Sequence, residues 1–113
     1  MKIEELEPKP LFKIQFKHSF YKNIPSISGC YVLTNYDNDI LYIGLSDDLQ
    51  SRFLQHLNNP EKTIPTENGK VIWFYYLEYD ITNLPKLERT WLNRFEALHG
   101  YKPILNKINS PVK

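Results

Sequence analysis

One acidic side chain in this sequence lies where an apolar one is expected. Residues 82–100 are predicted to form a helix that begins near Thr82 or Asn83 and stops at Gly100. Its apolar side chains fall on one arc of a helical wheel: Leu84, Leu87, Trp91, Leu92, Phe95 and Leu98. Glu88 lies inside that arc. Because burying a lone carboxylate is costly, Glu88 requires a partner, which is either a structural arginine or a metal ion.

A cation and an imidazole lie on a second predicted helix. Apolar residues recur at helical spacing after the capping residues Ser46 and Asp47: Leu49, Phe53, Leu54 and Leu57. Arg52 and His56 are four residues apart, hence one turn apart, and His56 lies at the margin of the apolar stripe. A side chain at the margin of the apolar stripe is well placed to belong to a functional site. The alternative is a surface arginine and an ordinary histidine.

Two tyrosines occur in a predicted β-hairpin at residues 30–44. β-forming residues flank the turn-forming residues 36–39. Side chains alternate between the faces of a sheet, so a two-residue loop would place Tyr31 and Tyr42 on the same face, and a three-residue loop would separate them. In a chain with eight tyrosines, packing in the core is the alternative role for both.

The order of these features resembles the GIY-YIG nuclease superfamily. The features that carry the resemblance are the tripeptides Gly29-Cys30-Tyr31 and Tyr42-Ile43-Gly44, the Arg52 and His56 pair, Glu88, and Asn106. The resemblance spans about residues 24–107. It implies a small α/β domain, with a three-stranded antiparallel sheet flanked by helices and a hairpin central to the site.

The resemblance further implies a metal-dependent endonuclease that hydrolyses phosphodiester bonds in DNA. Glu88 would be the sole protein ligand of a largely hydrated Mg²⁺, or of Mn²⁺ in its place. Arg52 would hold the scissile phosphate. A guanidinium and a metal ion are suited to these roles because negative charge builds on the phosphoryl and leaving oxygens during cleavage.

The same resemblance assigns roles to the other four residues. Tyr31 would lie beside the attacking water, and Tyr42 would be its hydrogen-bonding neighbour. His56 would help to activate the nucleophile or would orient Tyr31. Asn106 would be a positioning residue.

The chain departs from the family pattern in two places. Many members carry a basic or polar residue directly after the second tripeptide, where this chain has Leu45. Lys62 or Lys70, in a loop expected at residues 58–70, would be the substitutes. Many relatives also owe their specificity to an appended DNA-binding domain, whereas most of this chain is nuclease-like.

Charge is distributed unevenly along the chain, although its net value is only +1. Residues 8–36 and 97–113 contain lysines and no acids, and residues 37–96 contain ten acids and six bases. The predicted contacts with DNA phosphates are Lys13, Lys17, Lys22, Lys102 and Lys107, in addition to Arg52. The alternative is a mixed solvated surface. Low net charge predicts weak binding, so DNA structure, a protein partner or self-association would select the target.

The predicted domain covers residues 24–113, preceded by an N-terminal arm or extra strand at residues 1–23. Within that arm, residues 1–10 are expected to form a loose tail, and residues 11–16 to form a short strand or an extended segment. Residues 71–79 are rich in β-forming and apolar residues and are predicted to be the third strand.

Several classes of protein are disfavoured by composition. No apolar run approaches the ~20 residues of a membrane span. The N-terminus lacks the apolar core of a signal peptide, and Cys30 is the single cysteine, so a cytoplasmic location is expected.

The sequence leaves two alternatives to a nuclease open. One is a catalytically inactive nucleic-acid-binding or partner-recruiting module with the same fold, which Leu45 and the low net charge favour. The other is an α/β interaction domain whose aromatic residues serve only the core.

Overall fold

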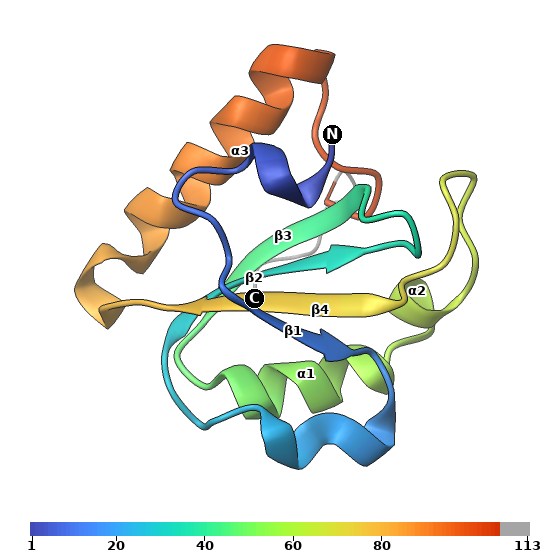
Figure 1. Cartoon of the computed structure of the whole chain (residues 1–113), viewed down its shortest axis with the longest axis vertical. Helices are drawn as coiled ribbons and strands as arrows, with labels where there is room; N and C mark the ends of the chain where they lie inside the picture. The colour runs from blue at the N-terminus through green and yellow to red at the C-terminus, as the bar shows by residue number, and fades with distance from the viewer. Residues whose placement is uncertain (107–113) are drawn as a thin grey trace.

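The computed structural model describes residues 1–106, in which a four-stranded antiparallel sheet carries helices on both faces (Figure 1). The strand order is β1-β4-β2-β3. The strands are β1 (Phe12–Gln15), β2 (Gly29–Thr34), β3 (Ile40–Ser46) and β4 (Trp73–Glu78). The α/β class and the antiparallel sheet are confirmed. The expected number of strands was three; the fourth is β1, so residues 11–16 contain the extra strand and not an extended segment.

Strand β2 lies in the middle of the sheet and is buried along its whole length. It pairs with β3 on one side and with β4 on the other. Alternate residues therefore enter two different cores: Cys30 and Val32 face one, and Tyr31 and Leu33 face the other. Burial of both faces explains why the sequence of β2 is nearly continuously apolar.

Helix α3 (Leu84–His99) covers the face of the sheet that carries Cys30 and Val32. It follows the short 3₁₀ helix η3 (Ile81–Asn83) and ends at Gly100, whose φ of 79° is the left-handed conformation that glycine adopts readily. Both predicted ends of this helix are confirmed to within two residues. No helix within residues 1–106 is long and apolar enough to cross a membrane.

Helix α1 (Leu49–Leu57) lies on the opposite face, beside the 3₁₀ helix η2 (His18–Asn23) (Figure 1). Its N-cap is Asp48, whose carboxylate accepts a hydrogen bond from the backbone N–H of Ser51 (3.0 Å). Leu49 and Phe53 are buried against the sheet, as their helical spacing predicts.

The expected loop at residues 58–70 contains a short helix, α2 (Pro60–Thr63). The side chain of Asn59 caps it by accepting a hydrogen bond from the N–H of Glu61 (2.9 Å), and Pro60 occupies its first turn. The expectation of a continuous loop was therefore wrong over these four residues. Asparagine followed by proline is a signal for a helix start as well as for a turn.

The β2–β3 hairpin has a longer loop than expected and reaches the expected geometry through a bulge. The N–H of Asn35 donates to the carbonyl of Asp39 (3.1 Å), which leaves three loop residues instead of two. That loop alone would place Tyr31 and Tyr42 on opposite faces. A bulge at Leu41 inserts one unpaired residue into β3 and returns both tyrosines to the same face.

The first ten residues pack on the sheet and do not form the expected loose tail. Ile3, in the 3₁₀ helix η1 (Ile3–Glu5), and Leu6 are buried in the core under α3. The ammonium of Lys2 lies 3.1 Å from the carboxylate of Asp39, and the N–H of Ile40 donates to the carbonyl of Met1 (2.9 Å). Ile3 and Leu6 stand among the acidic residues of this segment, and their burial explains why the segment packs on the sheet.

Candidate active site

Tyr31 and His56 meet beneath the sheet. The Tyr31 hydroxyl oxygen lies 2.6 Å from Nε2 of His56, and both side chains are buried. The ring of Tyr31 stacks on Phe74 of β4, with centroids 5.1 Å apart and planes inclined by 7°. Strand β2 supplies one partner of this hydrogen bond and α1 the other, so the two predicted elements bring these residues together.

Gly44 makes room for the Tyr31 ring. The two residues are paired across the β2–β3 ladder. A Cβ atom at position 44 would lie 2.6 Å from both Cζ and the hydroxyl oxygen of Tyr31. The glycine of the second tripeptide therefore lets the tyrosine of the first cross β3 and reach His56.

Burial sets the protonation of this pair. Burial, followed by the charges of Lys62 and Arg52, lowers the pKa of His56 to about 3, so its imidazole is neutral near pH 7. Burial raises the pKa of Tyr31 well above its usual value, so its hydroxyl keeps its proton. With the imidazole proton on Nδ1, the hydroxyl donates to Nε2. The arrangement is a proton donor aligned with a proton acceptor.

Tyr42 and Arg52 extend this cluster toward solvent. The half-buried ring of Tyr42 lies 6.0 Å from that of Tyr31 and 5.3 Å from that of His56, measured between centroids. Nη1 of Arg52 donates to the carbonyl of Leu45 (3.2 Å), at the end of β3. The charge of Arg52 lowers the pKa of His56 and opposes the burial that raises those of both tyrosines. This guanidinium therefore lies next to the hydroxyl groups.

Glu88 lies on α3, the helix that covers the face of the sheet opposite to Tyr31 and α1. The side chain is half-buried, and burial raises the pKa of its carboxyl, against the opposing charges of Arg89 and Lys102. Its charge adds to the burial that raises the pKa of Tyr42 and to the burial that raises the pKa of the Cys30 thiol to about 12. The charge of this carboxylate therefore acts on one side chain of the cluster, Tyr42.

No arginine within residues 1–106 forms an ion pair with Glu88, because the single ion pair of this range joins Lys2 to Asp39. Nor does this part of the chain contain a cluster of three His, Cys, Asp or Glu residues that could ligate a metal. One half-buried carboxylate with a raised pKa fits a Mg²⁺ ion that keeps most of its waters, because the ion would offset the buried charge. It does not fit a structural metal site.

Asn106 lies at the free edge of the sheet. Its side-chain amide accepts from the N–H of Ile43 (2.8 Å) and donates to the carbonyl of Ile43 (2.9 Å). The N–H of Leu105 donates to the carbonyl of Leu41 (2.9 Å). Asn106 therefore fastens the segment after α3 onto β3, the strand that carries Tyr42.

The predicted phosphate-binding lysines are spread around the domain. Lys102 is exposed and close enough to Glu88 to lower the pKa of its carboxyl. Lys13 lies on β1, at the sheet edge opposite β3, with Nζ 4.0 Å from the centroid of the Trp73 ring. Lys17 and Lys22 are exposed beside and within η2. Lys107 lies outside the described residues.

Lys62 also lies in this cluster, although the sequence indicated it only as an alternative to Lys70. It is buried, and its Nζ lies 4.9 Å from the centroid of the Tyr42 ring. In the sequence it was one of two interchangeable lysines in an expected loop. Lys70, the other, is exposed. The helix start at Asn59-Pro60 was the signal that could have separated them.

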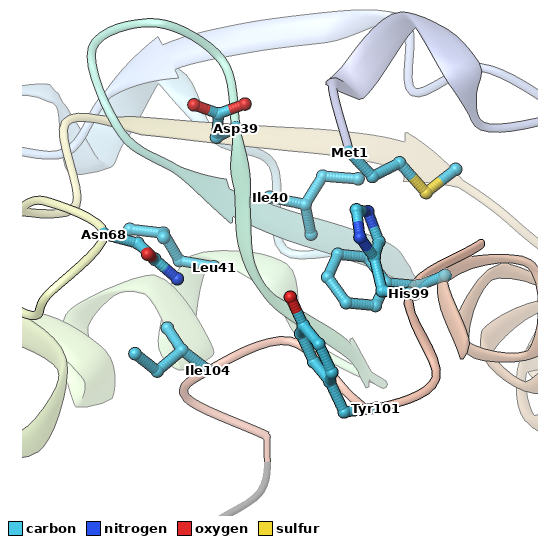
Figure 2. Close-up of a pocket in the computed structure, with 9 residues that line it drawn as sticks. Met1, Asp39, Ile40, Leu41, Asn68, His99, Tyr101 and Ile104 are labelled. Atoms are coloured by element: carbon cyan, nitrogen blue, oxygen red, sulfur yellow. The ribbon is translucent and has the colours of Figure 1, made fainter. Parts of the chain in front are cut away.

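A pocket of about 250 Å³ lies apart from this cluster, between the start of β3 and the end of α3 (Figure 2). It is lined by Met1, Asp39, Ile40, Leu41, Asn68, Phe95, His99, Tyr101 and Ile104. None of the six residues predicted as catalytic lines it. Nε2 of His99 is buried and has no hydrogen-bond partner in residues 1–106.

Comparison with known proteins identifies one family. The model of the GIY-YIG catalytic domain matches residues 27–102. Two relatives from Prochlorococcus marinus are both described as UvrABC system protein C. The protein of strain MIT 9312 is 38% identical over 117 aligned residues, covering 96% of this chain. That of subspecies pastoris, strain CCMP1986, is 37% identical over 114, covering 94%. The chain spans about 16% of the length of each relative.

Proposed function

The chain belongs to the GIY-YIG family, and from this premise we propose that it is a metal-dependent endonuclease that hydrolyses phosphodiester bonds in DNA. The observation that carries the proposal is the buried hydrogen bond of 2.6 Å between Tyr31 and His56. Arg52 flanks this bond, and the unpaired Glu88 lies near Tyr42. A domain that only binds DNA has no need to bury a proton donor against a neutral imidazole.

Tyr31 and His56 activate the attacking water. The Tyr31 hydroxyl is buried in the free protein, so the proposal requires that water reach it when DNA is bound. The water oxygen forms a bond to phosphorus while one of its protons passes to the Tyr31 hydroxyl oxygen. The hydroxyl gives its own proton to Nε2 of His56. The bond from phosphorus to the leaving oxygen breaks, and that oxygen takes a proton from solvent. Two proton transfers through one tyrosine thus connect the water to the histidine.

The cations around His56 couple substrate binding to this proton transfer. In the free protein, Lys62 and Arg52 contribute to the low pKa of His56. A phosphate anion bound beside them offsets their charge, so the basicity of His56 rises when substrate is present. Arg52 also matches two phosphate oxygens at once and opposes the negative charge that develops on them.

Glu88 would hold the metal ion of this proposal, which is Mg²⁺ or Mn²⁺. A divalent cation held there would offset the negative charge that develops on the phosphoryl and leaving oxygens. An ion held by Glu88 alone would keep most of its waters, because a single carboxylate leaves the other coordination positions to water and phosphate. The ring of Tyr42 lies 6.0 Å from that of Tyr31, and the charge of Glu88 adds to the burial that raises the pKa of Tyr42, which supports a role for Tyr42 between the metal ligand and the proton acceptor.

The proposed substrate is duplex DNA bound with little sequence specificity. The net charge of +1 supports weak binding, and Lys13, Lys17, Lys22, Lys102 and Lys107 are proposed to contact phosphates. A protein partner or self-association would then select the target. The action is proposed to be cytoplasmic, in keeping with the single thiol of Cys30, which is buried and free.

The direct test is nicking of supercoiled plasmid by the purified chain. We expect relaxed plasmid to accumulate in Mg²⁺ or Mn²⁺, and none in excess chelator. The Tyr31→Phe variant should bind the plasmid as the parent does and nick it about 10²-fold more slowly, because it lacks the hydroxyl alone. DNA binding without nicking under every metal condition would refute the proposal in favour of the binding module.

A further inference from the structure

Lys62 is buried, with 8% of its surface exposed. No other lysine or arginine and no aspartate or glutamate among residues 1–106 is buried. No carboxylate within this range lies at ion-pair distance from the Lys62 ammonium, because the single ion pair joins Lys2 to Asp39. The group that it contacts is the face of the Tyr42 ring, 4.9 Å from Nζ to the centroid. A cation held against an aromatic face without an acid still lacks a full counter-charge.

The backbone fixes Lys62 relative to His56. The N–H of Asn59 donates to the carbonyl of His56 (3.1 Å), and the N–H of Lys62 donates to the carbonyl of Asn59 (2.9 Å). Two successive hydrogen-bonded turns therefore join the end of α1 to α2. The Asn59 side chain caps α2 as well, so the position of Lys62 depends on helical geometry and not on a free loop.

This placement is unfavourable for the free protein. Burial lowers the pKa of the Lys62 ammonium, against the opposing charge of its exposed neighbour Glu61, and the charge of Lys62 adds to the burial that lowers the pKa of His56. A methionine of similar length would fill the same space without a charge. The ammonium is therefore retained at a cost to stability, which indicates that its counter-ion arrives with a ligand.

We propose that Lys62 is a phosphate-binding residue of the active site, and that its ammonium contacts the scissile phosphate from the side of Tyr42. This inference rests on the proposed nuclease function. Arg52, which is tied to the carbonyl of Leu45, approaches from the end of β3, so the two cations reach the phosphate from different elements. Lys62 supplies from α2 the positive charge that Leu45 does not supply from β3.

The test compares Lys62→Met with Lys70→Met, an exposed lysine in the segment between α2 and β4. We expect Lys62→Met to lower kcat for plasmid nicking about 10²-fold, as loss of one preorganised electrostatic group does, with KM changed far less. It should unfold at the parent's temperature or above it. Lys70→Met should nick like the parent. Lys62→Arg, or Leu45→Lys added to Lys62→Met, should recover at least about tenfold of the lost rate.

A second readout does not require cleavage. In a Glu88→Gln background, the logarithm of DNA affinity should fall with the logarithm of salt concentration, with a slope about 0.9 smaller in magnitude when Lys62 is also replaced by methionine. An unchanged slope would overturn the proposal. So would a Lys62→Met variant that nicks within about threefold of an active parent, or one whose loss neither Lys62→Arg nor Leu45→Lys restores. If the parent itself is inactive, the proposed function fails, and the slope still decides whether Lys62 contacts phosphate.

Discussion

Replacing Gly44 with alanine should test the packing that unites the two tripeptides. The added Cβ would lie 2.6 Å from Cζ and the hydroxyl oxygen of Tyr31 and 2.9 Å from Cε2 of Tyr42. The Tyr31 ring is fully buried and stacked on Phe74, so it has no open space to enter. Overpacking of this kind typically costs about 1–3 kcal/mol. In a chain of this size, that corresponds to a fall in Tm of roughly 4–12 °C.

The same change should lengthen the hydrogen bond of 2.6 Å between Tyr31 and His56 and so reduce nicking. Thermal unfolding by circular dichroism measures the stability, and a double-mutant cycle with Tyr31→Leu provides the control. Leucine lacks the two atoms that the new methyl group would strike. Gly44→Ala should therefore cost at least about 0.5 kcal/mol less in that background. Equal losses in both backgrounds, or a Tm within about 1 °C of the parent, would show that a methyl group at position 44 does not collide with the Tyr31 ring.

Three further outcomes are expected. Arg52→Ala should nick roughly 10²- to 10³-fold more slowly at an unchanged Tm, and an unfolded variant would make Arg52 structural. The parent's Tm should fall as the pH drops from 6.5 toward 3. In this range His56 binds a proton in the unfolded chain, whereas in the folded chain it stays neutral down to its lowered pKa of about 3, so protons favour the unfolded state. His56→Gln should remove that part of the fall, and an identical pH profile would contradict the burial. Asn106→Ala should lower stability in urea by about 1–3 kcal/mol, because it leaves the N–H and carbonyl of Ile43 unpaired; an unchanged midpoint would contradict this role.

The sequence predicted the elements that carry the site because their periodicities are local. Strong β-forming residues flank the hairpin turn, and apolar residues recur at helical spacing before and after Arg52 and Glu88. The common face of Tyr31 and Tyr42 was predicted correctly, although the loop length used to derive it was wrong. A three-residue loop and a bulge at Leu41 together have the same effect on register as the two-residue loop that was expected.

The helix start at Asn59-Pro60 could have placed Lys62 on a helix, but its burial could not be predicted from local signals. The residues around it contain prolines, asparagines and charges, which indicate a loop, and a lysine is rarely buried without a carboxylate. Its burial depends on the turn that follows α1 and on the Tyr42 ring of a distant strand. The docking of Ile3 and Leu6 is a similar case, since their burial depends on α3, about 80 residues later in the chain.

The contacts of Asn106 with the edge strand β3 could not be predicted from the sequence either. Its motif position indicated a positioning role, but the sequence did not identify the groups that it contacts. In the structure both ends of its amide bind the backbone of Ile43, so the side chain acts as one more pair of strand hydrogen bonds. Such a contact joins residues 63 positions apart and has no periodic signature.

Glu88 is proposed to hold the metal ion with which this chain cleaves DNA. Its role is tested by comparing the rate of plasmid nicking in Mg²⁺ for Glu88→Gln and for Glu96→Gln, a matched change at the other half-buried glutamate of α3, which lies outside the apolar arc of the helical wheel. Glu88→Gln keeps the shape of the side chain and removes the charge that would hold the cation, so it should fold like the parent and leave the plasmid supercoiled. Glu96→Gln should nick at the parent's rate. Parent-like nicking by Glu88→Gln would show that this carboxylate does not hold a catalytic metal ion.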